Sequence, residues 1–174
     1  MGPGFHAPTV GRFMEIVRAW ALQAWPMTRA QGIATYKTLG WVRADDDIES
    51  FTTDCTAGEA ESFFYASRGL VRMVDVQISS LMPPAAYGGF DSVIAGTYRA
   101  YYDEATTTWG EPVNEEDRGT GRSATWILPN DACLSLSGNR AGIGMIVTPP
   151  DQTEEYLTEL RTGTSIFDDP EALP

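Results

Sequence analysis

The residues that usually carry enzyme chemistry are scarce in this sequence. Nucleophilic catalysis by serine or cysteine commonly needs a positioned base, and histidine is the usual one. The only histidine, His6, lies at the start of the chain, and the two cysteines, Cys55 and Cys133, fall in segments typical of strands. A free thiol in a strand usually packs as a small hydrophobe, and one histidine with two cysteines cannot form the common zinc sites. We therefore expect no catalytic triad, no metal centre and no cofactor.

Carboxylates are abundant, with 24 Asp and Glu residues in 174. Two of them could act as an acid and base pair once the fold brings them together, so a carboxylate enzyme stays open as a third alternative. Solvated loops or helix faces explain the obvious clusters more simply, and the run Asp45–Glu49 lacks the glycine and the ligand spacing of a calcium loop. The clusters are Asp45–Asp47, Glu115–Asp117, Glu154–Glu155 and Asp168–Asp169.

Two glycine-rich segments, Gly119–Gly121 and Gly138–Gly144, invite comparison with nucleotide-binding loops. Such loops need a preceding strand and a following helix whose N-terminus faces the phosphate. In this sequence each segment is followed by a strand-like run. We interpret both as turns between strands.

The charge of the chain is uneven and restricts the classes of partner. The net charge is −12, and after residue 43 the chain carries seven basic residues against 23 acidic ones. Such a surface repels nucleic acid and anionic lipid and favours a basic protein partner; acidity that only keeps the protein soluble is the alternative. No run of eighteen apolar residues occurs and residues 1–9 lack the features of a signal peptide, so we expect a cytoplasmic protein that does not bind membranes.

The elements that must position any site mix helices and strands without strict alternation. Thr9 and Thr28 are placed to cap helices at about 10–25 and 29–38. The other predicted elements are strands at 50–55, 60–67 and 70–80, a helix from Phe90 to about Thr108, strands at 124–128, 132–137 and 143–148, and a short helix capped by Asp151 that runs through Leu160. This order favours an α+β fold. We predict a single domain over 1–161, with an antiparallel sheet of about six strands and helices packed on one face, followed by an acidic mobile tail over 162–174.

The segment from Trp109 to Gly121 is the candidate for binding a partner. It is the longest polar connection in the chain, and loops held by a rigid scaffold often carry recognition. An aromatic residue at its start could anchor an interface, although a core position for Trp109 and a solvated connection for the rest are the alternatives. The predicted contact residues are Trp109, Gly110, Glu111, Asn114, Glu115, Glu116, Asp117, Gly119 and Gly121, with Asn139 from the neighbouring turn.

Several short motifs give the chain a resemblance to a known group. They are Leu39-Gly40-Trp41, Phe51-Thr52-Thr53, Trp109-Gly110-Glu111-Pro112, Trp126, Leu134-Ser135-Leu136 and a hydrophobic strand that closes with Pro149-Pro150. In these motifs the chain resembles small actinobacterial immunity proteins of polymorphic toxins, and it is similar in size to immunity factors of the tuberculosis necrotizing toxin type. The resemblance implies an antitoxin that occupies the basic cleft of a cognate toxin, with an NAD glycohydrolase as the candidate target. A non-catalytic, chaperone-like or binding module of a bacterial secretion system is the alternative function.

Overall fold

A computed structural model describes residues 4–56 and 58–163 of the chain. The described helices are α1 (Val10–Ala21), α2 (Arg29–Thr38), α3 (Asp91–Trp109) and α4 (Thr153–Thr162). The described strands are β1 (Ser50–Phe51), β2 (Ser62–Ser67), β3 (Leu70–Gln77), β4 (Asn114–Asp117), β5 (Gly121–Ile127), β6 (Cys133–Asn139) and β7 (Gly142–Thr148). They form one antiparallel sheet in the order β1-β2-β3-β7-β6-β5-β4. The predicted α+β class is confirmed, with seven strands instead of six.

The first two helices begin where the capping residues predict. The Thr9 hydroxyl accepts a hydrogen bond from the backbone N–H of Arg12 at 3.2 Å. Thr28 and Gln31 form a complete capping box, in which each side chain accepts from the backbone of the other. Helix α1 ends at Ala21, earlier than predicted, and the free Ala21 carbonyl accepts hydrogen bonds from the side chain of Asn130 at 2.8 Å and from Nε1 of Trp25 at 3.1 Å.

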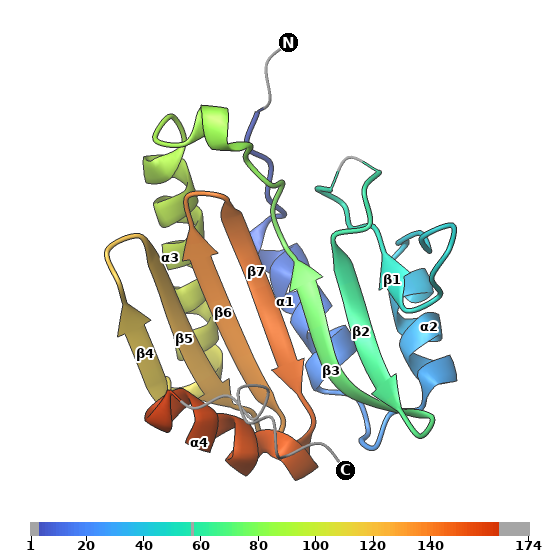
Figure 1. The fold of residues 1–174 in the computed structure, drawn as a ribbon. Helices are drawn as coiled ribbons and strands as arrows, with labels where there is room; N and C mark the ends of the chain where they lie inside the picture. Colours follow the sequence, from blue (N-terminus) through green and yellow to red (C-terminus); the bar gives the residue numbers. More distant parts are fainter. Residues whose placement is uncertain (1–3, 57, 164–174) are drawn as a thin grey trace.

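Helices α1 and α3 cover one face of the sheet and bury the main core between them and the strands (Figure 1). In β3 apolar and polar residues alternate, so Val74 and Val76 point into this core while Asp75 and Gln77 point to the opposite face. The stacked rings of Phe13 and Tyr101, 4.3 Å apart, join α1 to α3. None of the described helices has the length and apolarity needed to cross a membrane.

Helix α4 lies on the other face and crosses only one end of the sheet (Figure 1). The Thr153 hydroxyl donates to the carbonyl of Asp131 at 2.7 Å, and the Tyr156 hydroxyl is hydrogen-bonded to the Ser135 side chain on β6. The predicted cap at Asp151 is wrong, because its carboxylate forms an ion pair with Arg72 at 2.9 Å and α4 begins without a side-chain cap. Of the predicted tail, residues 164–174 lie outside the described residues.

Candidate protein-binding site

The predicted binding segment is an ordered hairpin and not an irregular connection. Residues Asn114–Asp117 form β4, the edge strand of the sheet, and pair antiparallel with β5 from Asn114 opposite Thr125 to Asp117 opposite Arg122. Our prediction of a loop from Trp109 to Gly121 is therefore wrong in its middle. The Asn-Glu-Glu-Asp sequence does not alternate apolar with polar residues, because an edge strand can expose both of its faces. Charged side chains on such a strand also discourage pairing with other chains.

The hairpin separates the predicted contact residues into two groups at opposite ends of β4. Trp109, Gly110 and Glu111 lie where α3 ends, and the Gly110 carbonyl accepts a hydrogen bond from Nε1 of Trp126 at 3.0 Å. Trp109 is partly buried and packs against the hydrophobic core. This position supports the core alternative for Trp109 more than the aromatic anchor.

Arginine and tyrosine side chains already engage the acidic residues of the hairpin. Glu116 pairs with Arg118 at 2.7 Å, and Asp117 pairs with Arg122 at 3.1 Å. The hydrogen bond from Tyr102 to Glu115 raises the pKa of that tyrosine hydroxyl. The free negative charge of the hairpin is thus smaller than the sequence suggests, because two of its carboxylates are offset by neighbouring cations.

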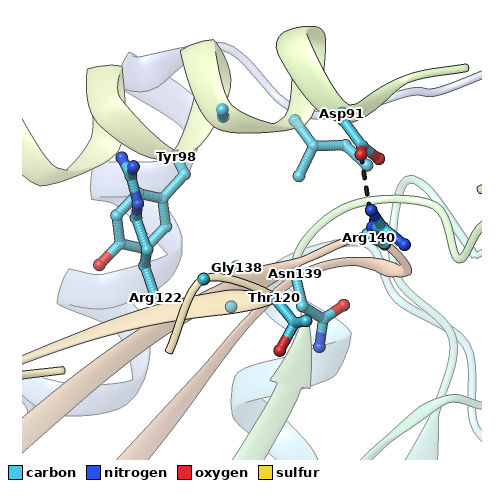
Figure 2. Close-up of a pocket in the computed structure, with 11 residues that line it drawn as sticks. Asp91, Tyr98, Thr120, Arg122, Gly138, Asn139 and Arg140 are labelled. Carbon is cyan, nitrogen blue, oxygen red and sulfur yellow. Dashed lines mark ion pairs between the residues drawn. The ribbon is translucent and has the colours of Figure 1, made fainter. Parts of the chain in front are cut away.

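A small cleft lies beyond the tip of the hairpin, between the start of α3 and the ends of β5 and β6 (Figure 2). Gly119, Gly121 and Asn139, which are distant from Trp109, come together here. Gly119 has a φ of 74°, which glycine adopts without strain and which allows the tight turn from β4 into β5. The register brings these residues together, since it places Gly121 opposite Asn139.

Mixed charges and a tyrosine line the cleft. Asp91 and Arg140 form an ion pair at 3.4 Å on one side, and Tyr98 lies with Arg122 on the other (Figure 2). Burial, followed by the nearby charge of Glu115, raises the pKa of Tyr98 to about 12. The ring of Tyr98 packs directly on Gly138, where a Cβ would lie 2.9 Å from Cδ2 of the ring.

The cleft itself is small and polar, and larger open grooves of about 420 and 340 Å³ adjoin it on either side of the hairpin. Its volume is about 190 Å³, whereas ligand pockets commonly have about 300–1,000 Å³ and mostly apolar walls. Shallow grooves on either side of the hairpin continue it, one along Tyr102 and Glu115 and another along Arg118 and Ser137. Together they form a polar, uneven surface around an ordered turn, which we call the hairpin end (residues 117–122 and 138–140).

A second surface, on the face of the sheet opposite α1 and α3, was not predicted from the sequence. We call it the open-face patch, and it consists of Phe63, Tyr65, Met73, Asp75 and Ile146. The side chain of Phe63 is 38% exposed and that of Tyr65 is 53% exposed. The run Phe63-Phe64-Tyr65 was the available signal, because neighbouring residues of a strand point to opposite faces and three aromatics in a row cannot all reach one core.

Residues 11–148 match a family described as a family of unknown function, DUF6301. The chain belongs to this family. The matched region runs from α1 through β7, so the family's span contains both the hairpin end and the open-face patch and stops before α4. No curated protein and no solved structure matches the chain.

Within the span that matches the family, the two thiols are poor nucleophiles. Burial raises the pKa of Cys133 to about 12, and burial with the neighbouring Asp54 raises the pKa of Cys55. The thiolate is the reactive form, so both side chains stay protonated near neutral pH. Among the described residues, no group of three or more His, Cys, Asp or Glu side chains is placed to bind a metal ion.

In the acidic run at Asp45–Glu49, two of the four carboxylates, those of Asp47 and Glu49, are engaged in local interactions. The Asp47 carboxylate accepts from the backbone N–H of Glu49 at 2.9 Å and from the Ser50 hydroxyl at 2.7 Å, which lowers its pKa. Glu49 forms an ion pair with Arg29. These contacts explain the run as a turn that leads into β1.

Proposed function

We propose that this chain is a non-catalytic immunity protein that binds a cognate toxin and covers the toxin's active site. The observation that carries the proposal is the hairpin end, an exposed turn whose backbone is already ordered by pairing with β5. An ordered turn loses little conformational entropy when it binds, which is the main benefit of preorganisation. The resemblance to toxin immunity proteins adds the kind of partner, with an NAD glycohydrolase as the candidate target.

Charge supports a basic cleft on the partner. The hairpin carries Glu115, Glu116 and Asp117 against Arg118 and Arg122, so the attraction for a basic partner comes mainly from the chain as a whole, with its net charge of −12. A negative electrostatic field speeds association with a basic partner and slows association with acidic proteins. The arginines at the hairpin end, Arg118, Arg122 and Arg140, are paired with carboxylates, and we expect them to fix the turn's geometry while the exposed carboxylates face the toxin.

A binding module of a secretion system is the second candidate function, and the open-face patch is the observation that favours it. A protein that only plugs a cleft with one turn has no need of exposed aromatics on a separate face. The neighbouring gene gives a quick discrimination, because a secreted toxin there favours the immunity protein and a secretion substrate or apparatus gene favours the module. In either case we propose that the chain works in the cytoplasm, where it would meet the partner before export.

The experiment uses point variants, since replacing residues 114–120 would remove β4 from the sheet. Thr120→Arg and Asp117→Arg add positive charge to the exposed turn without deleting a strand. Glu155→Arg on α4, an exposed residue outside the hairpin end, is the control, and it changes the net charge by at least as much as either turn variant. Each variant is first checked for an unchanged urea midpoint and then titrated against the toxin from the neighbouring gene.

We expect the two turn variants to weaken inhibition by about tenfold or more, because like charges brought together at an interface cost over 1 kcal/mol. The control should lose no more than about twofold, through general steering. Equal losses in all three variants would mean that only net charge matters. That result would remove the hairpin end from the proposal.

A further inference from the structure

The open-face patch combines exposed apolar side chains with a carboxylate that has no partner. Phe63, Asp75 and Ile146 stand side by side across β2, β3 and β7, because Phe63 is opposite Asp75 and Asp75 is opposite Ile146. Tyr65 and Met73 form the next pair toward the end of the strands. Among the described residues, neither a hydrogen bond nor an ion pair reaches the Asp75 carboxylate, and burial alone raises its pKa.

We propose that the open-face patch docks an amphipathic helix of a partner protein, whose apolar side carries one arginine or lysine opposite Asp75. This surface is separate from the hairpin end, so the proposal does not depend on the immunity function. Its occupant is defined by three features of the chain: the layer in which the patch lies, the unpaired carboxylate, and the overall charge.

The position of the patch, on the sheet face that α4 covers only in part, indicates that its occupant is a helix. Sheets bury an apolar face by packing against another layer, and helices on a sheet are one of the stable solutions. Helix α4 already packs on this face, where Tyr156 is hydrogen-bonded to Ser135 and lies near Asp75, but among the described residues it runs toward β5 and β6 and leaves Phe63 and Tyr65 of β2 exposed (Figure 1). A second helix beside it would complete the layer, and a helix with its side chains is about 10 Å wide, close to the width of two strands.

The unpaired carboxylate indicates a cation on that helix. Asp75 is half-buried between two apolar neighbours, and covering the patch would remove its remaining contact with water. A carboxylate buried without a partner is costly, whereas a guanidinium or ammonium group at hydrogen-bonding distance offsets much of that cost. An entirely apolar helix would therefore bind this patch poorly.

The overall charge disfavours a second copy of the same chain. Two molecules that each carry a net charge of −12 repel one another, and each would bring an acidic surface to Asp75. Of the six basic side chains on the described helices, Arg12, Arg29 and Arg99 already pair with carboxylates of the same molecule, which leaves few cations that a second copy could bring to Asp75. The occupant is consequently a different protein with a basic residue on an apolar helix face.

The test uses a pair of synthetic peptides of about 18 residues, a length that gives about five helical turns. Both have a leucine stripe and a neutral glutamine and alanine face; one carries a single arginine in the centre of the stripe and its twin carries glutamine there. Affinity is measured by fluorescence anisotropy for the full chain and for Tyr65→Ser, Phe63→Ser and Asp75→Asn. Val42→Ser and Val93→Ser, at exposed apolar positions outside the patch, serve as controls.

We expect the arginine peptide to bind about tenfold more tightly than its twin to the unaltered chain, and this preference should fall below about twofold in Asp75→Asn. Tyr65→Ser and Phe63→Ser should each weaken binding of both peptides by about tenfold, as loss of aromatic anchors usually does. The Val42 and Val93 variants should bind like the unaltered chain. Backbone amide shifts in an NMR titration should concentrate on β2, β3 and β7.

Four outcomes would overturn the proposal. One is that neither peptide binds; another is that both bind the unaltered chain equally well; the third is that the amide shifts concentrate away from the patch. A concentration-dependent dimer in sedimentation that Phe63→Ser abolishes would also overturn it, because the patch would then serve a second copy. Circular dichroism and the urea midpoint of each variant establish that it is folded before its affinity is interpreted.

Discussion

Replacing Asp75 with asparagine should make the free protein more stable near neutral pH. The carboxyl is half-buried between Phe63 and Ile146, and this burial raises its pKa above the ordinary value of 3.8. In the isolated chain its ionised form therefore carries a desolvation cost that no described cation offsets. Asparagine has nearly the same shape and removes the charge.

The expected gain in the free energy of unfolding follows from the cost of burying a polar group without a hydrogen-bond partner, which is about 1–3 kcal/mol. Because Asp75 keeps some contact with water, we expect the lower end, about 1 kcal/mol, or a rise in melting temperature of about 2–4 °C for a chain of this length. The native carboxyl holds its proton to a higher pH than the unfolded one, so stability falls as pH rises through the interval between the two pKa values. The advantage of the variant should accordingly grow from about pH 4 toward neutrality and disappear below the unfolded value of 3.8.

Urea unfolding followed by tryptophan fluorescence, at about pH 7 and about pH 3.5, measures both parts of this prediction. Asp46→Asn, at an exposed position, is the matched control and should change stability by less than about 0.5 kcal/mol. A variant that is less stable than the unaltered chain at neutral pH would refute the reasoning. So would a difference that is the same at both pH values, because it could not arise from ionisation of Asp75.

Two further predictions concern packing and thiol reactivity. Gly138→Ala should destabilise the fold by about 1–3 kcal/mol, because its Cβ would lie 2.9 Å from the Tyr98 ring. Gly96→Ala, in α3 with no atom within 4 Å of a new Cβ, should instead stabilise it by about 1 kcal/mol in the same urea assay; equal effects would show that the Tyr98 contact is not tight. Cys133, which is buried and has a pKa raised to about 12, should react with a thiol reagent only after unfolding. Labelling of Cys133 in the native protein at the rate of a free thiol would contradict its placement.

Local signals in the sequence were sufficient for most of the fold. The capping residues Thr9 and Thr28 placed the starts of α1 and α2, and the alternation in β3 identified its buried face. These features depend on neighbours within a few residues, which is why they can be read from one sequence. The end of α1 was harder to read in this way, since one of the two side chains that bond to its last carbonyl, Asn130, lies more than a hundred residues away.

The candidate site was predictable only in part. The pairing of Gly121 with Asn139 follows from turns that the glycines indicate, whereas β4 was missed because a charged edge strand lacks an apolar pattern. Charge counting also overstated the free acidity of the hairpin, since the partners of Glu116 and Asp117 are set by side-chain geometry. The run Phe63-Phe64-Tyr65 indicates that aromatic side chains lie on both faces of β2, but whether the outer pair is exposed depends on how far α4 covers the sheet, which the strand's own sequence does not encode.

The most direct test of the proposed immunity function is a titration of the toxin from the neighbouring gene with the purified chain. The toxin's turnover is measured at a fixed toxin concentration well above the dissociation constant while the chain is added in steps. A non-catalytic inhibitor predicts that activity falls in proportion to the chain added and reaches zero at an equimolar ratio. Unchanged activity in excess chain would contradict the account, and so would complete inactivation by a small fraction of an equivalent, because the chain would then be acting as an enzyme.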